Sequence, residues 1–122
     1  MWIFLPGGFV SVVHKDCPPH YVLVRARSRA HLNSFFEPLP SRERRSVQER
    51  VRAHEGTDYQ FRVSVPRATL KRVLAVHVED LDYSNFKNAA ERLVPLSSPQ
   101  GARWIGALHD VWSAVWGAFR GF

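Results

Sequence analysis

The stretch from Thr57 to Lys87 constrains the fold most, because a strand pattern passes into a helical pattern at one proline. Residues 59–65 alternate between apolar and polar side chains, which is the period of a half-buried strand. Pro66 lacks the N–H that a ladder needs, so it ends the strand. Apolar residues then recur at helical spacing over 70–78. A strand that leads directly into a helix gives a sheet one apolar cover.

Two further strands are predicted near residues 9–15 and 20–27, which are rich in β-branched and aromatic side chains. The two prolines between them favour a turn, so the strands form a hairpin. With residues 59–65 they predict a three-stranded antiparallel sheet. The apolar N-terminus MWIFLPGG is interpreted as a buried strand, or as two short pieces joined at the Pro-Gly-Gly turn.

Helical segments are predicted between and after these strands. Ser28 is a candidate cap for a short helix over 29–36, and Asp82 for another after it. The Arg-rich residues 41–53 favour an exposed helix or a mobile loop, in which only Val47 and Val51 can face a core.

The terminal segment 104–119 has the clearest periodicity, with three tryptophans on one stripe. We expect this amphipathic helix to close the core. The sequence therefore predicts one α+β domain over residues 1–122: a three-stranded antiparallel sheet packed with three to four helices.

The charge balance favours an anionic partner. Lys and Arg number 17 against 11 Asp and Glu, which gives a formal charge of +6 and permits binding to nucleic acid or to an acidic protein face. Cys17 is the only cysteine, so no intrachain disulfide forms. The N-terminus lacks the charged start of a signal peptide and is too short to span a bilayer, so we expect a soluble cytoplasmic protein without membrane contact.

Several segments in order, MWIF, GFVSVV, LVRAR, GTDYQFRVSVPR, DLDYSNFKNAAER and HDVWSAVW, resemble a family of small uncharacterised bacterial proteins. The resemblance covers most of the chain except residues 38–54 and 94–103, and it implies a small intracellular α+β protein. It implies no reaction, cofactor or substrate. The residues that match the pattern are Trp2, Ser11, Arg25, Arg27, Asp58, Tyr59, Arg62, Asp82, Tyr83, Asn85, Phe86, Lys87, His109 and Trp112.

Strand alternation predicts that three arginines share one face of the sheet. Arg25 and Arg27 fall on one side of the second strand with Tyr21, and Arg62 alternates with the buried residues of the third. Ser11 falls on one side of the first strand. If these faces coincide, guanidinium groups and an aromatic ring form a surface that can bind phosphate and stack on a base.

The competing interpretation of these arginines is structural. It places the Trp-rich terminal helix over the same face and pairs the arginines with Asp58 and Asp82. The run of arginines from 42 to 52 also has two interpretations. It is either a patch that neutralises phosphates with salt-dependent affinity, or a solvated helix face with interspersed glutamates.

The segment DYSNFK supplies a second candidate binding site, formed by Tyr83, Asn85 and Lys87. Lys87 is placed to reach an anion. The alternative is that Asp82 and Asn85 cap a helix while Tyr83 and Phe86 anchor the turn.

Metal and catalytic signatures are weak. His14, Cys17 and His20 have a ligand-like spacing, but three ligands beside two stiff prolines do not make a zinc site. His109 beside Asp110 is a candidate acid–base group, but nucleophile motifs, paired carboxylates and glycine-rich phosphate loops are lacking. We predict no metal, no cofactor and no assigned catalytic residue.

Three functions remain open from the sequence. The leading hypothesis is a non-catalytic binding module, an adaptor or an inhibitor, whose basic surface contacts a protein or nucleic acid. The second is a small phosphodiester-cleaving enzyme that uses His109 or His14 with Arg25, Arg27 and Arg62. The third is a homodimeric structural protein that pairs through the tryptophans of the terminal helix.

Overall fold

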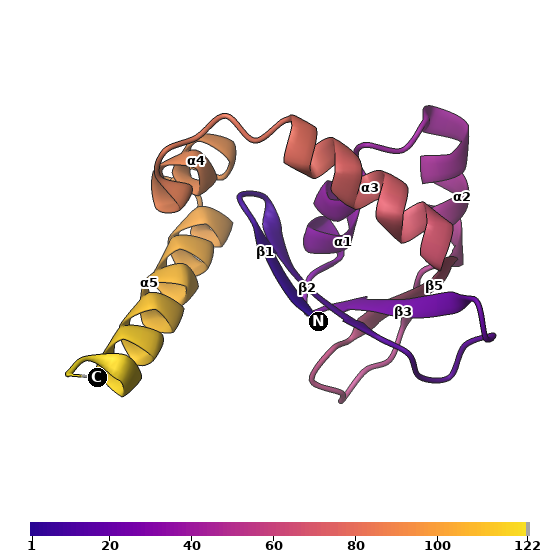
Figure 1. The fold of residues 1–122 in the computed structure, drawn as a ribbon, viewed down its shortest axis with the longest axis horizontal. Coiled ribbons are helices and arrows are strands. Elements are labelled where there is room, and N and C mark those ends of the chain that lie inside the picture. The colour runs from indigo at the N-terminus through magenta and orange to yellow at the C-terminus, as the bar shows by residue number, and fades with distance from the viewer. Residues whose placement is uncertain (122) are drawn as a thin grey trace. The chain divides into compact units, whose positions relative to one another are not determined.

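The computed structural model describes residues 1–121, which divide into two compact units, 1–82 and 83–121. The fold class is α+β, with an antiparallel sheet and a long C-terminal helix, as the sequence predicts (Figure 1). Each unit is described by itself. The prediction that residues 1–122 form one domain whose core is closed by the terminal helix therefore stays a prediction.

The first unit holds a five-stranded antiparallel sheet in the order β1-β2-β3-β5-β4. Its strands are β1 Trp2–Leu5, β2 Gly8–Val13, β3 Tyr21–Ala26, β4 Arg52–Ala53 and β5 Phe61–Pro66. The prediction of three strands is thus wrong, because the sheet has two further strands, β1 and β4, at its edges. The N-terminal segment makes two strands because the chain turns at Pro6 and Gly7. The two residues of β4 are too few to leave a periodic signal.

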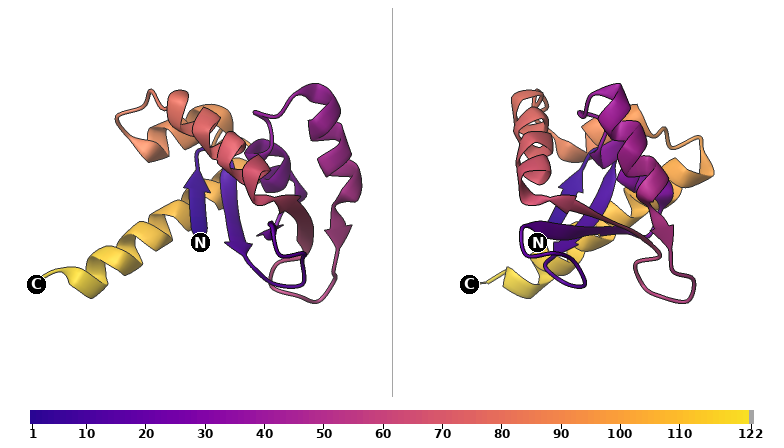
Figure 2. Two further views of the ribbon diagram at one scale, coloured as in Figure 1. Left: turned by 45° about the vertical axis from the view of Figure 1, so that its right-hand side comes forward. Right: turned by 90° about the vertical axis from the view of Figure 1, so that its right-hand side faces the viewer.

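Residues 1–121 form five helices rather than the three to four predicted. Three belong to the first unit: α1 Arg29–Phe35, α2 Ser41–Arg50 and α3 Arg67–Glu79. Within this unit α1 and α3 lie on the same face of the sheet, as the views in Figure 2 show. The Arg-rich segment is helical, and Val47 and Val51 are its buried residues, as predicted.

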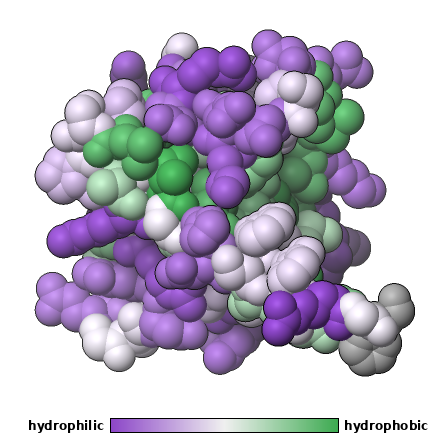
Figure 3. Space-filling view, turned by 90° about the vertical axis from the view of Figure 1, so that its left-hand side faces the viewer, coloured by the Kyte–Doolittle hydropathy of each residue, from purple (hydrophilic) through white to green (hydrophobic). Residues whose placement is uncertain are grey.

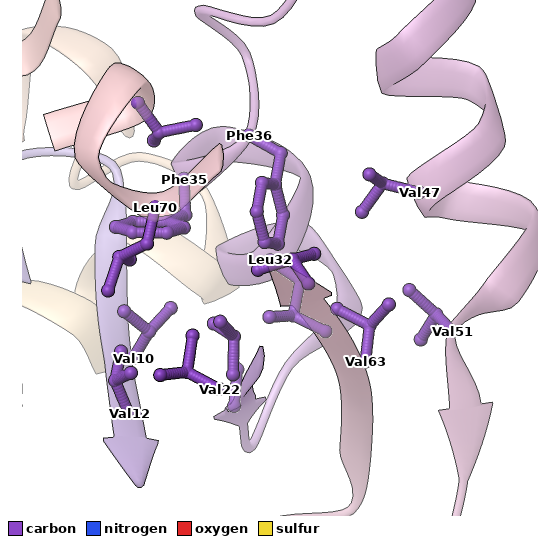
Figure 4. Close-up of a cluster of buried hydrophobic side chains, with 14 of the residues drawn as sticks. Val10, Val12, Val22, Leu32, Phe35, Phe36, Val47, Val51, Val63 and Leu70 are labelled. Atoms are coloured by element: carbon purple, nitrogen blue, oxygen red, sulfur yellow. The ribbon is translucent and has the colours of Figure 1, made fainter. Parts of the chain in front are cut away.

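The hydrophobic core lies between the sheet and these helices (Figure 4). Alternate residues of the inner strands form the sheet side of this core. On the helix side, the rings of Phe35 and Phe36 in the α1 segment contact each other edge to face. The largest fully buried apolar side chains are Val10, Val24, Leu32, Phe35, Phe36, Val47, Val65 and Val73. Because this face is apolar, the polar residues of the same strands must lie on the other face of the sheet.

Gly8 is required where β2 passes under α1. A Cβ at this position would lie 2.5 Å from the ring of His31, which is closer than real Cβ contacts. The close approach allows the N–H of Phe9 to donate to Nδ1 of His31 at 3.2 Å. Burial of the ring lowers the pKa of His31 from its ordinary value, against the opposing effect of the bond from Phe9.

The second unit is a helix pair, α4 Phe86–Leu93 and α5 Pro99–Phe119. Of the two predicted caps, Asp82 and Asn85, it is Asn85 that caps α4: its side-chain oxygen accepts the N–H of Asn88 at 3.0 Å. Ser98 caps α5 in the same way through the N–H of Gly101. No helix within residues 1–121 combines the length and the apolar character needed to cross a membrane.

Candidate functional site

A continuous row of paired residues crosses the sheet of the first unit. The register sets Trp2 opposite Ser11, Ser11 opposite Arg25, Arg25 opposite Arg62, and Arg62 opposite Arg52. Directly opposed residues of antiparallel strands share one face. The row therefore begins with an indole on β1 and ends with three arginines on β3, β5 and β4. We call it the cross-sheet row.

The cross-sheet row lies on the face of the sheet that points away from α1 and α3. Its strand neighbours Val10, Val24 and Val63 are buried in the core on the opposite face. Within residues 1–82 no helix packs against the side of the row. We call this side of the sheet the arginine face, and it includes Arg27, which directly follows β3.

Tyr59 organises the arginines on this face. The guanidinium carbons of Arg25 and Arg27 each lie 4.4 Å from the centre of its ring. A cation over a tyrosine ring contributes about 0.5–1 kcal/mol at exposed sites and more when desolvated. The ring is only 5% exposed, so it supports the two charged groups and is not itself a free surface.

Arg25 is held by hydrogen bonds only in part. One terminal nitrogen donates to the hydroxyl of Ser11 at 2.9 Å, which explains why a serine is fully buried at that place in β2. Its Nε is buried and lacks a hydrogen-bond partner among the described residues. A buried donor without an acceptor costs about 1–3 kcal/mol of folding free energy. The other contacts of Arg25 must offset this cost for the side chain to stay in this position.

The arginines of the face have no acidic partners in the described chain. Within residues 1–121 the ion pairs join Arg44 to Glu37 and Arg72 to Glu43. The predicted pairing of Arg25, Arg27 and Arg62 with Asp58 and Asp82 is therefore not found there. The carboxylate of Asp58 instead accepts the N–H of Tyr59 at 2.9 Å. The positive charge of the face is uncompensated by these aspartates.

The other end of the face is aromatic. Phe4 and Phe9 stack with their ring centres 4.5 Å apart, and Trp2 meets Phe9 edge to face at 5.8 Å. Phe9 in turn lies 6.2 Å from Tyr59, so the rings connect β1 to the arginines. Trp2 is 70% exposed. It therefore presents an indole surface to solvent beside the cationic region.

A pocket of about 250 Å³ lies where the row reaches β5 and β4. Arg50, Arg52 and His54 line it together with Arg62 and Ser64 of β5. These residues converge because α2 runs directly into β4, which pairs with the start of β5. The remaining lining residues are Asp16, Leu23 and Val63.

Tyr83, Asn85 and Lys87, the second predicted site, lie in the second unit, so they are described apart from the arginine face. Asn85 is the cap of α4, and the ring of Tyr83 packs against Phe86 at 5.9 Å. The amino group of Lys87 lies 5.8 Å from the ring centre of Trp112. Each residue thus has a structural contact, and a binding role for the three stays a prediction.

The C-terminal half of α5 exposes its apolar stripe. Trp104 and Leu108 are buried, whereas Trp112 and Trp116 are more than half exposed and stack on each other at 6.1 Å. The space-filling view in Figure 3 shows apolar side chains at the surface beside hydrophilic ones. Periodicity along 104–119 indicates which residues share a face but not what covers them, so closure of the core by this helix stays a prediction.

The two histidines proposed for chemistry each have local contacts within their own unit. Nδ1 of His14 lies 3.5 Å from the sulfur of Cys17 and 3.1 Å from the carbonyl of Tyr21. His109 stacks on Trp112 in the second unit. Within residues 1–121 no three His, Cys, Asp or Glu side chains are grouped as a metal site.

Sequence reasoning did not place three residues of this site where the structure has them. Tyr59 was assigned to the core face of a strand, but β5 begins only at Phe61, and the preceding loop turns the ring to the arginine face. Arg52 belonged to the predicted Arg-rich patch, but on an exposed helix or mobile loop, whereas it lies in β4. His54 was not singled out as a candidate from the sequence.

Comparison of the chain with protein-family models, curated proteins and solved structures gives no significant match.

Proposed function

We propose that this protein is a binding module whose arginine face holds single-stranded nucleic acid. The proposal rests on one observation: the arginine face gathers four arginines without a paired carboxylate in residues 1–121. Arg25 and Arg27 lie over the ring of Tyr59. Arg25 also belongs to the cross-sheet row, which ends in Arg62 and Arg52. Guanidinium groups bind phosphate oxygens and stack on bases, and an exposed indole adds a further stacking surface.

Charge supports a nucleic acid more than an acidic protein. The formal net charge is +6, and each neutralised phosphate releases condensed counterions. The aromatic end supports the same choice, because stacking on aromatic side chains contributes about 1–3 kcal/mol per base. A protein ligand would need carboxylates for the arginines and would gain less from the flat surface of Trp2.

The length of the row supports an oligomer. Its five residues lie on five adjacent strands, and strand spacings of about 4.8 Å place its ends roughly 19 Å apart. A single nucleotide cannot contact Trp2 and Arg52 together. A single strand with unstacked bases can follow the row, whereas a duplex keeps its bases inside.

Fluorescence anisotropy with a labelled oligonucleotide of about twelve residues tests this proposal. RNA and DNA single strands and a duplex of the same sequence are titrated at about 50 mM and at about 200 mM salt. We expect the single strand to bind more tightly than the duplex and to weaken steeply with salt. Equal affinities for the single strand and the duplex would contradict the proposal that Trp2 stacks on unpaired bases.

A second candidate function is phosphodiester cleavage, and the pocket at Arg50, Arg52 and Arg62 favours it because it also contains His54. A histidine that transfers protons beside arginines that bind phosphate is a plausible pair for this chemistry. The enzyme would use His54 and not His14 or His109. Prolonged incubation with labelled RNA and DNA, compared with His54→Ala, tests it: cleavage that the substitution abolishes supports an enzyme.

The third possibility, a homodimer, is favoured by the exposure of Trp112 and Trp116 on α5. Sedimentation at two protein concentrations tests it. A concentration-dependent increase in mass that Trp112→Ser removes supports pairing through this helix.

A further inference from the structure

The pocket at the end of the cross-sheet row has a charge pattern that suits a phosphate group. Arg50, Arg52 and Arg62 line it, and Asp16 is the only carboxylate among its lining residues. Within residues 1–121 none of the three arginines forms an ion pair. Three positive charges that converge beside a single carboxylate repel one another, and a bound anion relieves that repulsion.

Backbone carbonyls fix the three guanidinium groups. Arg50 donates to the carbonyl of Ser64 at 2.8 Å, Arg62 to that of Tyr59 at 2.9 Å, and Arg52 to that of Glu49 at 3.4 Å. Arginine has five N–H donors, so each keeps further donors after its single bond. Because these hydrogen bonds orient the guanidinium groups before a ligand arrives, the entropy cost of binding is lower.

The size of the pocket limits its ligand. At about 250 Å³ it is smaller than the roughly 300–1,000 Å³ of pockets that enclose whole drug-sized molecules. It suits a phosphate and part of its sugar better than a complete nucleotide. A phosphate monoester carries a charge of about −1.5 to −2 near neutral pH, which matches an excess of arginines over carboxylates better than the single charge of a phosphodiester.

We infer that this pocket binds the terminal phosphate monoester of the strand that lies along the arginine face. The inference rests on the proposed function, and the link between the two is physical: Arg62 and Arg52 belong both to the row and to the pocket. A strand that follows the row therefore reaches the pocket at its end. The protein then selects phosphorylated ends over hydroxyl ends.

The test compares three single strands of one sequence, with a 5′-phosphate, a 3′-phosphate or neither. We expect one phosphorylated strand to bind about tenfold more tightly than the hydroxyl strand, since charge-assisted bonds to a dianion are about twice as strong as neutral ones. Equal affinities of the three strands overturn the inference but leave the proposed function standing. Failure of every strand to bind overturns both.

Two variants of α2 and a free ligand sharpen the test. Arg50→Gln is expected to abolish the preference for the phosphorylated strand, whereas Arg45→Gln, an equal loss of charge at an exposed position of the same helix, keeps it. A preference that survives Arg50→Gln contradicts the inference. Ribose 5-phosphate separates the sources of the phosphate: it is expected to compete only weakly, and competition as strong as that of the phosphorylated strand contradicts a strand-end site.

Discussion

The guanidinium group of Arg25 lies 4.4 Å from the centre of the Tyr59 ring, with Arg27 at the same distance. Tyr59 lies in the loop before β5, whereas both arginines belong to the β3 segment, so the contact joins parts of the chain that are far apart in sequence. A buried ring thereby holds two positive charges at the surface of a sheet. This support distinguishes the arginine face from the exposed arginines of α2.

Replacing Tyr59 with alanine should weaken both folding and binding. The ring is buried and touches Arg25, Arg27 and Phe9, and removal of a buried aromatic side chain costs about 3 kcal/mol. Tyr59→Phe keeps the ring and should cost less than about 1 kcal/mol. Urea unfolding of both variants measures the difference. A phenylalanine variant as unstable as the alanine variant would show that the hydroxyl, and not the ring, is essential.

Trp2→Ala should reduce binding without reducing stability. The indole is 70% exposed, so little apolar contact is lost on substitution, whereas loss of one stacked base costs about 1–3 kcal/mol, or roughly five- to 150-fold in affinity. Anisotropy titrations beside urea unfolding curves separate the two effects. Trp112→Ala, at an exposed tryptophan of the second unit, is the matched control. An unchanged affinity of Trp2→Ala would remove the aromatic end from the site.

Stability should fall as the pH drops below the ordinary pKa of histidine, and His31 should account for part of that fall. Burial lowers the pKa of His31 in the folded chain below the ordinary histidine value of about 6.5. The unfolded chain therefore takes up a proton before the folded chain does, so the contribution is present above about pH 6.5 and is lost as the pH falls through the folded pKa.

His31→Gln keeps an acceptor for the N–H of Phe9 but does not titrate in this range. Unfolding free energies measured across the acidic range should decrease less steeply for this variant than for the unmodified chain. The other histidines remain in both proteins, so the difference between the curves belongs to position 31. Parallel curves would contradict the role assigned to burial of this ring.

Two glycine-to-alanine substitutions should act in opposite directions. Gly8→Ala drives a methyl group into the ring of His31 and should destabilise the first unit by about 1–3 kcal/mol. Gly106→Ala meets no atom within 4 Å on α5 and should stabilise that helix by about 0.5–1 kcal/mol. Circular dichroism during urea unfolding reports both. A harmless alanine at position 8 would show that α1 does not pack as closely as described.

The regular elements could be predicted because their side chains repeat with a period. Alternation in β3 and β5 placed Arg25 and Arg62 on polar faces, and the register makes them direct neighbours. Pro66 marked the junction of β5 and α3 as expected. The hairpin of β1 and β2 was one of two alternatives, because the turn residues do not distinguish a bent strand from a pair.

The rest of the site could not be predicted, since it depends on contacts that leave no local pattern. The sequence alternation of β5 includes Tyr59 and predicts that its side chain lies on the core face. Tyr59 instead precedes the strand, which begins at Phe61, and its ring contacts Arg25 and Arg27. Arg52 and His54 enter the pocket only because two residues of β4 pair with β5. A strand of that length has no period to detect.

The most direct test of the central claim compares two double variants of equal charge. Arg27→Gln with Arg62→Gln removes two positive charges from the arginine face, and Arg42→Gln with Arg45→Gln removes two from exposed positions of α2. Single-strand affinity is measured across a salt series for both variants and for the unmodified chain. We predict that the salt slope decreases by about 1.4 for the first variant only, since each phosphate contact on a single strand contributes about 0.7. Equal slopes for the two variants would mean that net charge, and not this face of the sheet, attracts the nucleic acid.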